Sequence, residues 1–165
     1  MKPYVLSCCS GADLSREHFD RREIRYLYFH FEVGGIEYQD DLGKSMPPEE
    51  LYQRMIAGES TKTSQVSIGE YTEHFERFLK EGQDVLHVTL SSGISGTFNS
   101  ARLAAEDLAE KYPERKIYVV DSLAASSGYG LFMDALGDQR DRGMDIDGLY
   151  QWGEEGKRDL DHWFF

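Results

Sequence analysis

Residues 90–97 read Leu90-Ser91-Ser92-Gly93-Ile94-Ser95-Gly96-Thr97, a stretch of hydroxyl groups and glycines. An apolar run, 85–90, precedes it, and an amphipathic segment, 98–112, follows it. This order predicts a buried strand that leads through a small polar loop into a helix. The free N–H groups and the positive dipole end of such a helix start favour an anion. Because Ser91, Ser92, Ser95 and Thr97 add uncharged donors, we expect a site for a carboxylate or a phosphate.

The rest of the chain predicts strands that alternate with helices. Strand-like runs cover residues 3–7, 26–33, 85–90 and 117–120, and Gly34-Gly35 predicts a hairpin into 36–38. Helices are expected after Pro47-Pro48, after a Ser67–Glu70 capping box, over 98–112, from Leu123 to Arg142, and after an Asp145 cap. We therefore expect an α/β fold, a three-layer sandwich with a mainly parallel sheet. Ligands of such folds bind at the carboxyl ends of the strands, here the loops 8–13, 91–97 and 121–127.

Composition narrows the classes of function. With 165 residues, one domain is expected, and the net charge of −12 argues against nucleic acid or an anionic membrane surface as the partner. No apolar run approaches the roughly 18 residues of a membrane span, and no signal pattern is visible, so a cytoplasmic location is expected.

The five histidines are scattered, so no metal is expected. Cys8 and Cys9 are adjacent and are read as small buried residues, with no disulfide framework.

Common enzyme motifs do not match. Gly93-Ile94-Ser95-Gly96 lacks the glycine spacing of a nucleophile elbow. Gly43-Lys44-Ser45 resembles the end of a phosphate loop, but Tyr38 occupies the upstream glycine position. Two alternatives stay open: an enzyme that uses the hydroxyl-rich loops for a small carboxylated or phosphorylated metabolite, and an interaction module without a small-molecule ligand.

A second polar segment, residues 61–67, precedes the helix that Ser67 is expected to cap. Its further hydroxyl and amide side chains exceed what capping requires. If this loop meets the loop at 91–97, a carboxylate could accept hydrogen bonds from Thr63 and Ser92, each worth roughly 1.5–3 kcal/mol. The third loop is small and apolar around Ala124 and Ala125, so a long chain could lie there between helix and sheet, although tight helix packing would use the same residues.

Three motifs together resemble the DegV family. They are Thr63-Ser64-Gln65-Val66-Ser67, Leu90-Ser91-Ser92-Gly93-Ile94-Ser95-Gly96-Thr97-Phe98-Asn99-Ser100-Ala101 and Val119-Val120-Asp121-Ser122. The segments 10–15 and 35–40 fall in the matching order and spacing. This is a family of bacterial fatty-acid-binding proteins, called FakB when they partner a fatty acid kinase.

The resemblance implies that residues 1–165 form the N-terminal α/β domain of a two-domain protein. Thr63 and Ser92 would hold the carboxylate of a palmitate-like fatty acid, supported by Ser64, Ser91, Ser95 and Thr97. A partner kinase would phosphorylate the bound acid, so the protein would present substrate and carry no catalytic residue, metal or cofactor. Where the family has Asp-Ser after its first strand, this chain has Cys9-Ser10, which leaves Ser10 as an expected contact.

The last residues, 160–165, read like the start of a strand, and we interpret them as the crossover to a C-terminal lid domain. That second domain would close over the acyl chain. Without it, we expect the chain to bind fatty acid weakly, or to form a homodimer through the exposed apolar face.

Overall fold

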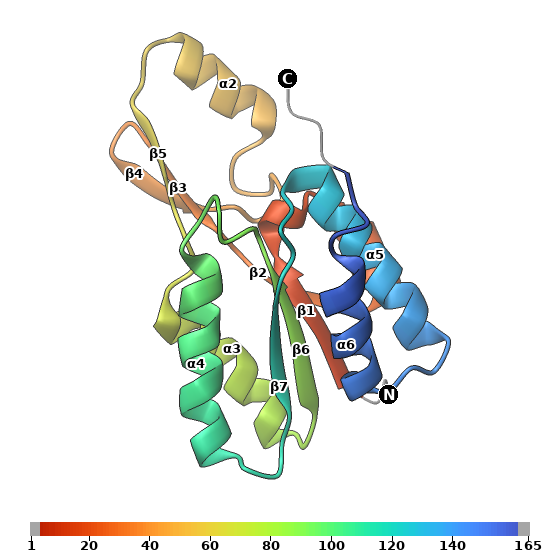
Figure 1. The fold of residues 1–165 in the computed structure, drawn as a ribbon. Coiled ribbons are helices and arrows are strands. Elements are labelled where there is room, and N and C mark those ends of the chain that lie inside the picture. The colour runs from red at the N-terminus through yellow and green to blue at the C-terminus, as the bar shows by residue number, and fades with distance from the viewer. Residues whose placement is uncertain (1–3, 162–165) are drawn as a thin grey trace.

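The computed structural model describes residues 4–161, and a parallel sheet of four strands forms its centre (Figure 1). The strand order is β2-β1-β6-β7, which confirms the expected parallel sheet. Its strands are β1 (Tyr4–Cys9), β2 (Ile24–Leu27), β6 (Asp84–Thr89) and β7 (Ile117–Asp121). In β1, Leu6 pairs with Ile24 on one side and Leu86 on the other, so the central strands are covered by neighbours at both edges.

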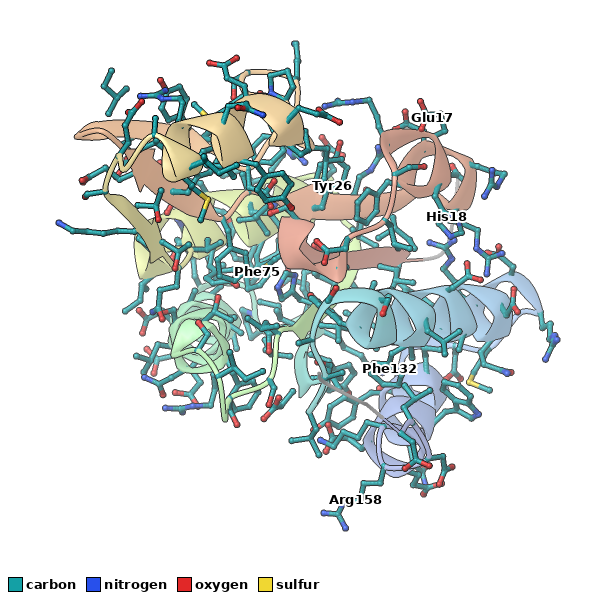
Figure 2. All side chains as sticks on the ribbon, turned by 90° about the horizontal axis from the view of Figure 1, so that it is seen from above. Glu17, His18, Tyr26, Phe75, Phe132 and Arg158 are labelled. Carbon is teal, nitrogen blue, oxygen red and sulfur yellow. The ribbon has the colours of Figure 1, made fainter. Side chains whose placement is uncertain are left out.

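Helices cover both faces of this sheet. One face carries α3 (Ile68–Lys80) and α4 (Thr97–Lys111), and the other carries α1 (Arg16–Arg22), α5 (Ser126–Asp141) and α6 (Ile146–Gly156). Alternate side chains of β1 point to opposite faces, because successive residues of a strand do so: Leu6 joins the core under α5 and Val5 the core under α3. Phe75 of α3 and Phe132 of α5 mark the two cores in Figure 2. The three-layer sandwich is confirmed.

A small antiparallel sheet projects beyond the carboxyl end of the parallel sheet (Figure 1). It consists of β3 (His30–Val33), β4 (Ile36–Gln39) and β5 (Thr61–Ser64), and α2 (Pro48–Ile56) lies beside it. Gly34 and Gly35, with φ of 59° and 81°, form the predicted hairpin turn, which glycine adopts without steric cost.

Two sequence predictions about this region were wrong. Residues 26–33, read as one strand, belong to β2 and β3 in two different sheets. Residues 61–64, read as a capping loop, form β5 and pair with β3. Every residue of β5 is exposed, so its sequence lacks the alternation of apolar and polar residues that indicates a strand with one buried face.

The helix caps follow the predictions more closely. Ser67 and Glu70 form the capping box, and Asp145 accepts the N–H of Gly148 at the start of α6. The helix expected from Leu123 begins only at Ser126, because Leu123 has a left-handed backbone with φ of 55°. Of the expected strand start at 160–165, residues 160 and 161 are not in a strand, and the rest lies outside the described residues.

Candidate functional site

A cavity of about 770 Å³ lies at the carboxyl ends of β1 and β6, where the antiparallel sheet and α2 form its other walls. Because neighbouring parallel strands end at one edge of the sheet, the loops after β1 and β6 meet there. The loop after β1 contributes Gly11 and Asp13, and the loop after β6 contributes residues 94–96. The cavity therefore lies where the sequence places the ligand site of an α/β fold.

One wall of the cavity is polar and uncharged. It is formed by Thr63, Ser64 and Gln65 at the end of β5 and by Ser95 and Gly96 before α4. The two segments are joined by hydrogen bonds of the Gln65 side chain. Gln65 Oε1 accepts from the Ser95 hydroxyl at 3.4 Å, and Gln65 Nε2 donates to Ser100 Oγ at 3.0 Å. The two hydroxyl-rich segments therefore meet through Gln65 and Ser95.

The first turn of α4 opens onto this wall. Its N-cap is Gly96, which provides no side-chain cap; the Thr97 N–H donates to Ser95 Oγ, and the positive end of the helix dipole faces the same loop. Gly96 also fits closely against Gln65: a Cβ at this position would lie 2.8 Å from Gln65 Oε1. Glycine therefore allows the amide side chain to lie directly over the helix start.

A second set of lining residues, here called the apolar wall, is apolar or aromatic. These residues are Phe29, Phe31, Met46, Pro48, Leu51, Tyr52, Leu90 and Ile94. Met46 is buried, whereas Tyr52 and Ile94 are about 60% exposed (60% and 62%). A hydrocarbon that contacted these two side chains would remove apolar surface from water.

Three acidic residues, Asp13, Asp40 and Asp41, line the cavity from the loops that follow β1 and β4. Two of these carboxylates already accept hydrogen bonds. Asp13 Oδ2 accepts from the Ser126 hydroxyl at 2.6 Å, and Asp41 Oδ1 accepts from the N–H groups of Lys44 and Ser45 at 2.9 and 3.0 Å. Burial opposes ionisation of Asp41, but these N–H donors outweigh it, so its pKa is lowered. This end of the cavity is negatively charged and repels an anion.

The predicted site residues fall into three groups. Thr63, Ser64 and Ser95 line the cavity. Ser91, Thr97 and Ser10 are buried, and their hydroxyl groups make contacts within the protein: Ser91 Oγ accepts from Gly93 N–H at 3.2 Å, Thr97 Oγ1 pairs with the Tyr71 hydroxyl at 2.7 Å, and Ser10 Oγ accepts from Phe29 N–H at 3.0 Å.

Ser92, Ala124 and Ala125, the third group, do not line this cavity. Ser92 is exposed, and its N–H donates to Asp121 Oδ1 at 3.1 Å, which ties the loop after β6 to the end of β7. Ala124 is buried in the core, and its carbonyl accepts from Ser91 N–H at 3.0 Å. The carboxylate contact that the resemblance implies for Ser92, and the contact with a long chain that the small apolar loop suggests for Ala124 and Ala125, stay predictions.

The sequence reasoning missed Gln65 as an individual site residue, and it missed the apolar wall. Gln65 lies between a run of hydroxyl residues and the buried Val66. The only local indication of a role for Gln65 was that helix capping does not require its amide. Met46 precedes α2 and Leu51 lies within it. Their joint position on one wall depends on how α2 folds back over β3, which local patterns do not report.

The buried cysteines are thiols and not nucleophiles. Burial raises the pKa of Cys9 to about 12, and it raises that of Cys8 well above its usual value. A neutral thiol is neither a good nucleophile nor a good metal ligand. Within residues 4–161, no group of three or more His, Cys, Asp or Glu side chains is placed to hold a metal ion. Over the same range, each helix is too short or too polar to cross a membrane.

Comparisons with known proteins agree with this architecture. The family model described as "Uncharacterised protein, DegV family" matches residues 9–165. A DegV domain-containing protein from Clostridium perfringens is 36% identical over 164 residues, which cover 99% of this chain and 56% of that protein. The chain thus spans about half the length of the curated relatives it matches.

Two solved structures are similar in fold and sequence. A stearic-acid-binding protein from Eubacterium ventriosum superposes with a TM-score of 0.82 at 27% identity, over 92% of this chain and 52% of that one. A DegV family protein from Thermus thermophilus, described by its fatty acid binding, also gives 0.82 at 27% identity, over 94% and 54% of the two chains. The family match covers nearly the whole chain, and the chain belongs to the DegV family.

Proposed function

We propose that this protein binds a long-chain fatty acid in the cavity at the carboxyl end of the sheet. One observation carries the proposal: a single cavity has an uncharged hydrogen-bonding wall, with Gln65 and Ser95, and an apolar wall, with Met46 and Leu51. This combination suits a molecule with one polar end and a long hydrocarbon. The fatty acids named for the two similar structures support the same ligand class.

The charges of the cavity set the direction of the ligand. A carboxylate is repelled from the side lined by Asp13, Asp40 and Asp41, and it is favoured beside neutral donors and a helix start. We place the head group at Thr63, Ser64 and Ser95. Ser92, exposed on the same loop as Ser95, is proposed as a further contact on the basis of the family resemblance.

The hydrocarbon supplies most of the affinity. Each methylene removed from water contributes about 0.8 kcal/mol, so a long chain gains several times more than one hydrogen bond to the head group contributes. The exposed side chains of Tyr52 and Ile94 support incomplete cover of the hydrocarbon by this wall. We therefore propose that the chain alone binds fatty acid weakly, or pairs as a homodimer over this face.

The remaining part of the proposal concerns the reaction partner. Cys8 and Cys9 are buried and their raised pKa values keep them as thiols, so neither is an activated nucleophile. We propose that the protein presents the bound carboxylate to a fatty acid kinase, which carries out phosphoryl transfer, and that the protein itself is not an enzyme. In that reaction a carboxylate oxygen of the fatty acid would attack the terminal phosphoryl group of a nucleoside triphosphate held by the kinase, which gives an acyl phosphate and releases the nucleoside diphosphate.

Calorimetric titration with palmitate, together with native mass spectrometry, tests the binding proposal. Ser95→Ala and Thr63→Val should each weaken palmitate binding by roughly tenfold to a hundredfold, the value of one hydrogen bond to a charged acceptor. Leu51→Asp, which puts a charge on the apolar wall, should abolish it. Thr72→Val is the matched control, because Thr72 lies on α3 and its hydroxyl only donates to Ile68 O at 2.9 Å.

Two results would overturn the proposal. One is a wild-type chain that neither retains nor binds palmitate at any accessible concentration. The other is palmitate binding that the Leu51→Asp change leaves intact. Tight stoichiometric lipid on a monomer would show instead that the cavity covers the hydrocarbon without help, against the weak affinity proposed here.

A further inference from the structure

A line of polar side chains, all buried except the partly buried His74, crosses the layer between the parallel sheet and α3. His74 Nε2 lies 2.7 Å from Ser7 Oγ, and Ser7 Oγ lies 3.0 Å from His87 Nδ1. His87 Nε2 is 3.8 Å from Cys9 Sγ, and Cys9 Sγ is 3.1 Å from the Tyr71 hydroxyl. Polar groups are rare in such a layer because each must be paired. These contacts form one connected row beneath the cavity.

Tyr71 stands at the end of this row. Its side chain is fully buried, and the edge of His87 packs on its ring at a centroid distance of 5.2 Å. Its hydroxyl lies between Cys9 Sγ and Thr97 Oγ1, the second contact being 2.7 Å. Burial raises the pKa of Tyr71 well above its usual value, so the hydroxyl keeps its proton. A ring packed on several sides holds this hydroxyl in one place.

Thr97 connects the Tyr71 hydroxyl to the cavity wall. It is the first residue of α4, its side chain is buried, and its own N–H donates to Ser95 Oγ at 3.2 Å. A lone pair of Ser95 Oγ is therefore used by the main chain, and its O–H points to Gln65 Oε1 across a long 3.4 Å contact. A small rotation of this O–H would direct it to a ligand oxygen. Ser95 is thus arranged to donate to an acceptor.

Because the Tyr71 hydroxyl fixes Thr97, we propose that Tyr71 is a positioning residue for the head-group site, although it does not line the cavity. Through Thr97 it sets the first turn of α4 so that Ser95 presents a donor to the carboxylate. The inference rests on the proposed binding of a fatty acid. It also implies a selectivity. Because Tyr71, through Thr97, fixes the direction of the Ser95 donor, the site distinguishes an ionised carboxylate from a neutral head group.

The test compares Tyr71→Phe with Tyr112→Phe in the intact chain. Tyr112 is the matched control, because its hydroxyl also links α4 to α3, donating to Glu76 Oε1 at 3.0 Å, but at the other end of α4. The ligands are oleate and oleyl alcohol, which differ only in the head group. The readouts are both affinities and the pKa of the bound carboxyl, followed by the carbon NMR shift of oleate labelled at C1.

Tyr71→Phe should lower the oleate affinity by roughly threefold to tenfold, leave the oleyl alcohol affinity unchanged, and raise the pKa of the bound carboxyl. Tyr112→Phe should change none of these quantities. If Tyr71→Phe fails to fold, Thr97→Val removes the same contact from its other partner and should give the same pattern.

The inference is overturned if Tyr71→Phe binds both ligands like the wild type, or if it weakens both equally, since the second result indicates only a structural role. Failure of the proposed function looks different. In that case the wild-type chain itself does not bind oleate, and the inference falls with it.

Discussion

The Ser95 hydroxyl donates a hydrogen bond to Gln65 Oε1 over 3.4 Å, although the two residues are 30 positions apart in the chain. This contact brings the end of an exposed antiparallel strand to the start of a helix of the main sandwich. Gln65 also donates to Ser100 Oγ, so its amide is held by two side chains of the α4 region. The uncharged wall of the cavity depends on this amide.

Gly96→Ala tests that dependence. The added Cβ would lie 2.8 Å from Gln65 Oε1, so the amide must move and lose its contacts with Ser95 and Ser100. We expect palmitate affinity to fall by roughly threefold to tenfold, with a loss of stability of about 1 kcal/mol. Gly93→Ala in the same loop is the control, because its Cβ would meet only Ser91 Oγ at an ordinary 3.5 Å. Equal affinities of the two variants, measured by calorimetry, would contradict this reading.

Gly130→Ala should destabilise the fold strongly. Gly130 lies in α5 where that helix approaches the turn after β1, and a Cβ would lie 2.4 Å from Ala12 O, a backbone atom that cannot move cheaply. We expect a loss of roughly 2–4 kcal/mol in urea denaturation. Gly156→Ala in α6 is the control: its Cβ would lie 3.9 Å from Trp152, and it should be neutral or slightly stabilising. A Gly130→Ala variant as stable as the wild type would show that α5 can shift away.

Tyr129→Phe should also be costly. The buried Tyr129 hydroxyl donates to Val88 O at 2.5 Å and accepts from Cys9 N–H at 3.1 Å, which joins the ends of β1 and β6. Its removal leaves a buried N–H and a buried carbonyl without this partner, so we expect a loss of about 2–4 kcal/mol. Tyr52→Phe, which removes a hydroxyl from a 60% exposed side chain, should change the free energy of unfolding little. Thermal or urea unfolding of both variants gives the comparison.

Stability should fall in acid because of two histidines, His87, which is buried, and His74, which is partly buried. Burial, with smaller contributions from Arg77 and Arg25, lowers the pKa of His74 from 6.5 to about 3, and burial lowers that of His87 well below its usual value. The unfolded chain therefore binds more protons than the folded one below pH 6.5. The stability is fully present above that pH, and each histidine removes up to about 1.4 kcal/mol per pH unit as the pH falls towards 3.

The corresponding measurement is the free energy of unfolding between pH 7 and pH 4 for the wild type and for His74→Gln. Glutamine can still hydrogen-bond Ser7 but does not titrate, so the variant should show a shallower decline with falling pH. Identical slopes would mean that His74 is not held neutral in the folded chain.

The local patterns of the sequence were sufficient to predict the main sandwich. Continuous apolar runs indicated β6 and β7, and the capping residues Ser67 and Asp145 marked two helix starts that the structure confirms. These features depend on hydrogen bonds and periodicities within a few residues, so a single sequence carries them. The hydroxyl-rich loops were visible for the same reason, and so was the edge of the sheet at which they meet.

Only the tertiary structure decided which hydroxyls reach the cavity. Ser91, Ser95 and Thr97 look alike in the sequence, but Thr97 turns inward to Tyr71 and Ser91 accepts from its own loop, while Ser95 lines the cavity. That division is set by the direction of each side chain relative to the sheet. It depends on long-range contacts of α3 and β5, because a hydroxyl binds whichever partner the packing brings within hydrogen-bond distance, and no local pattern reports that partner.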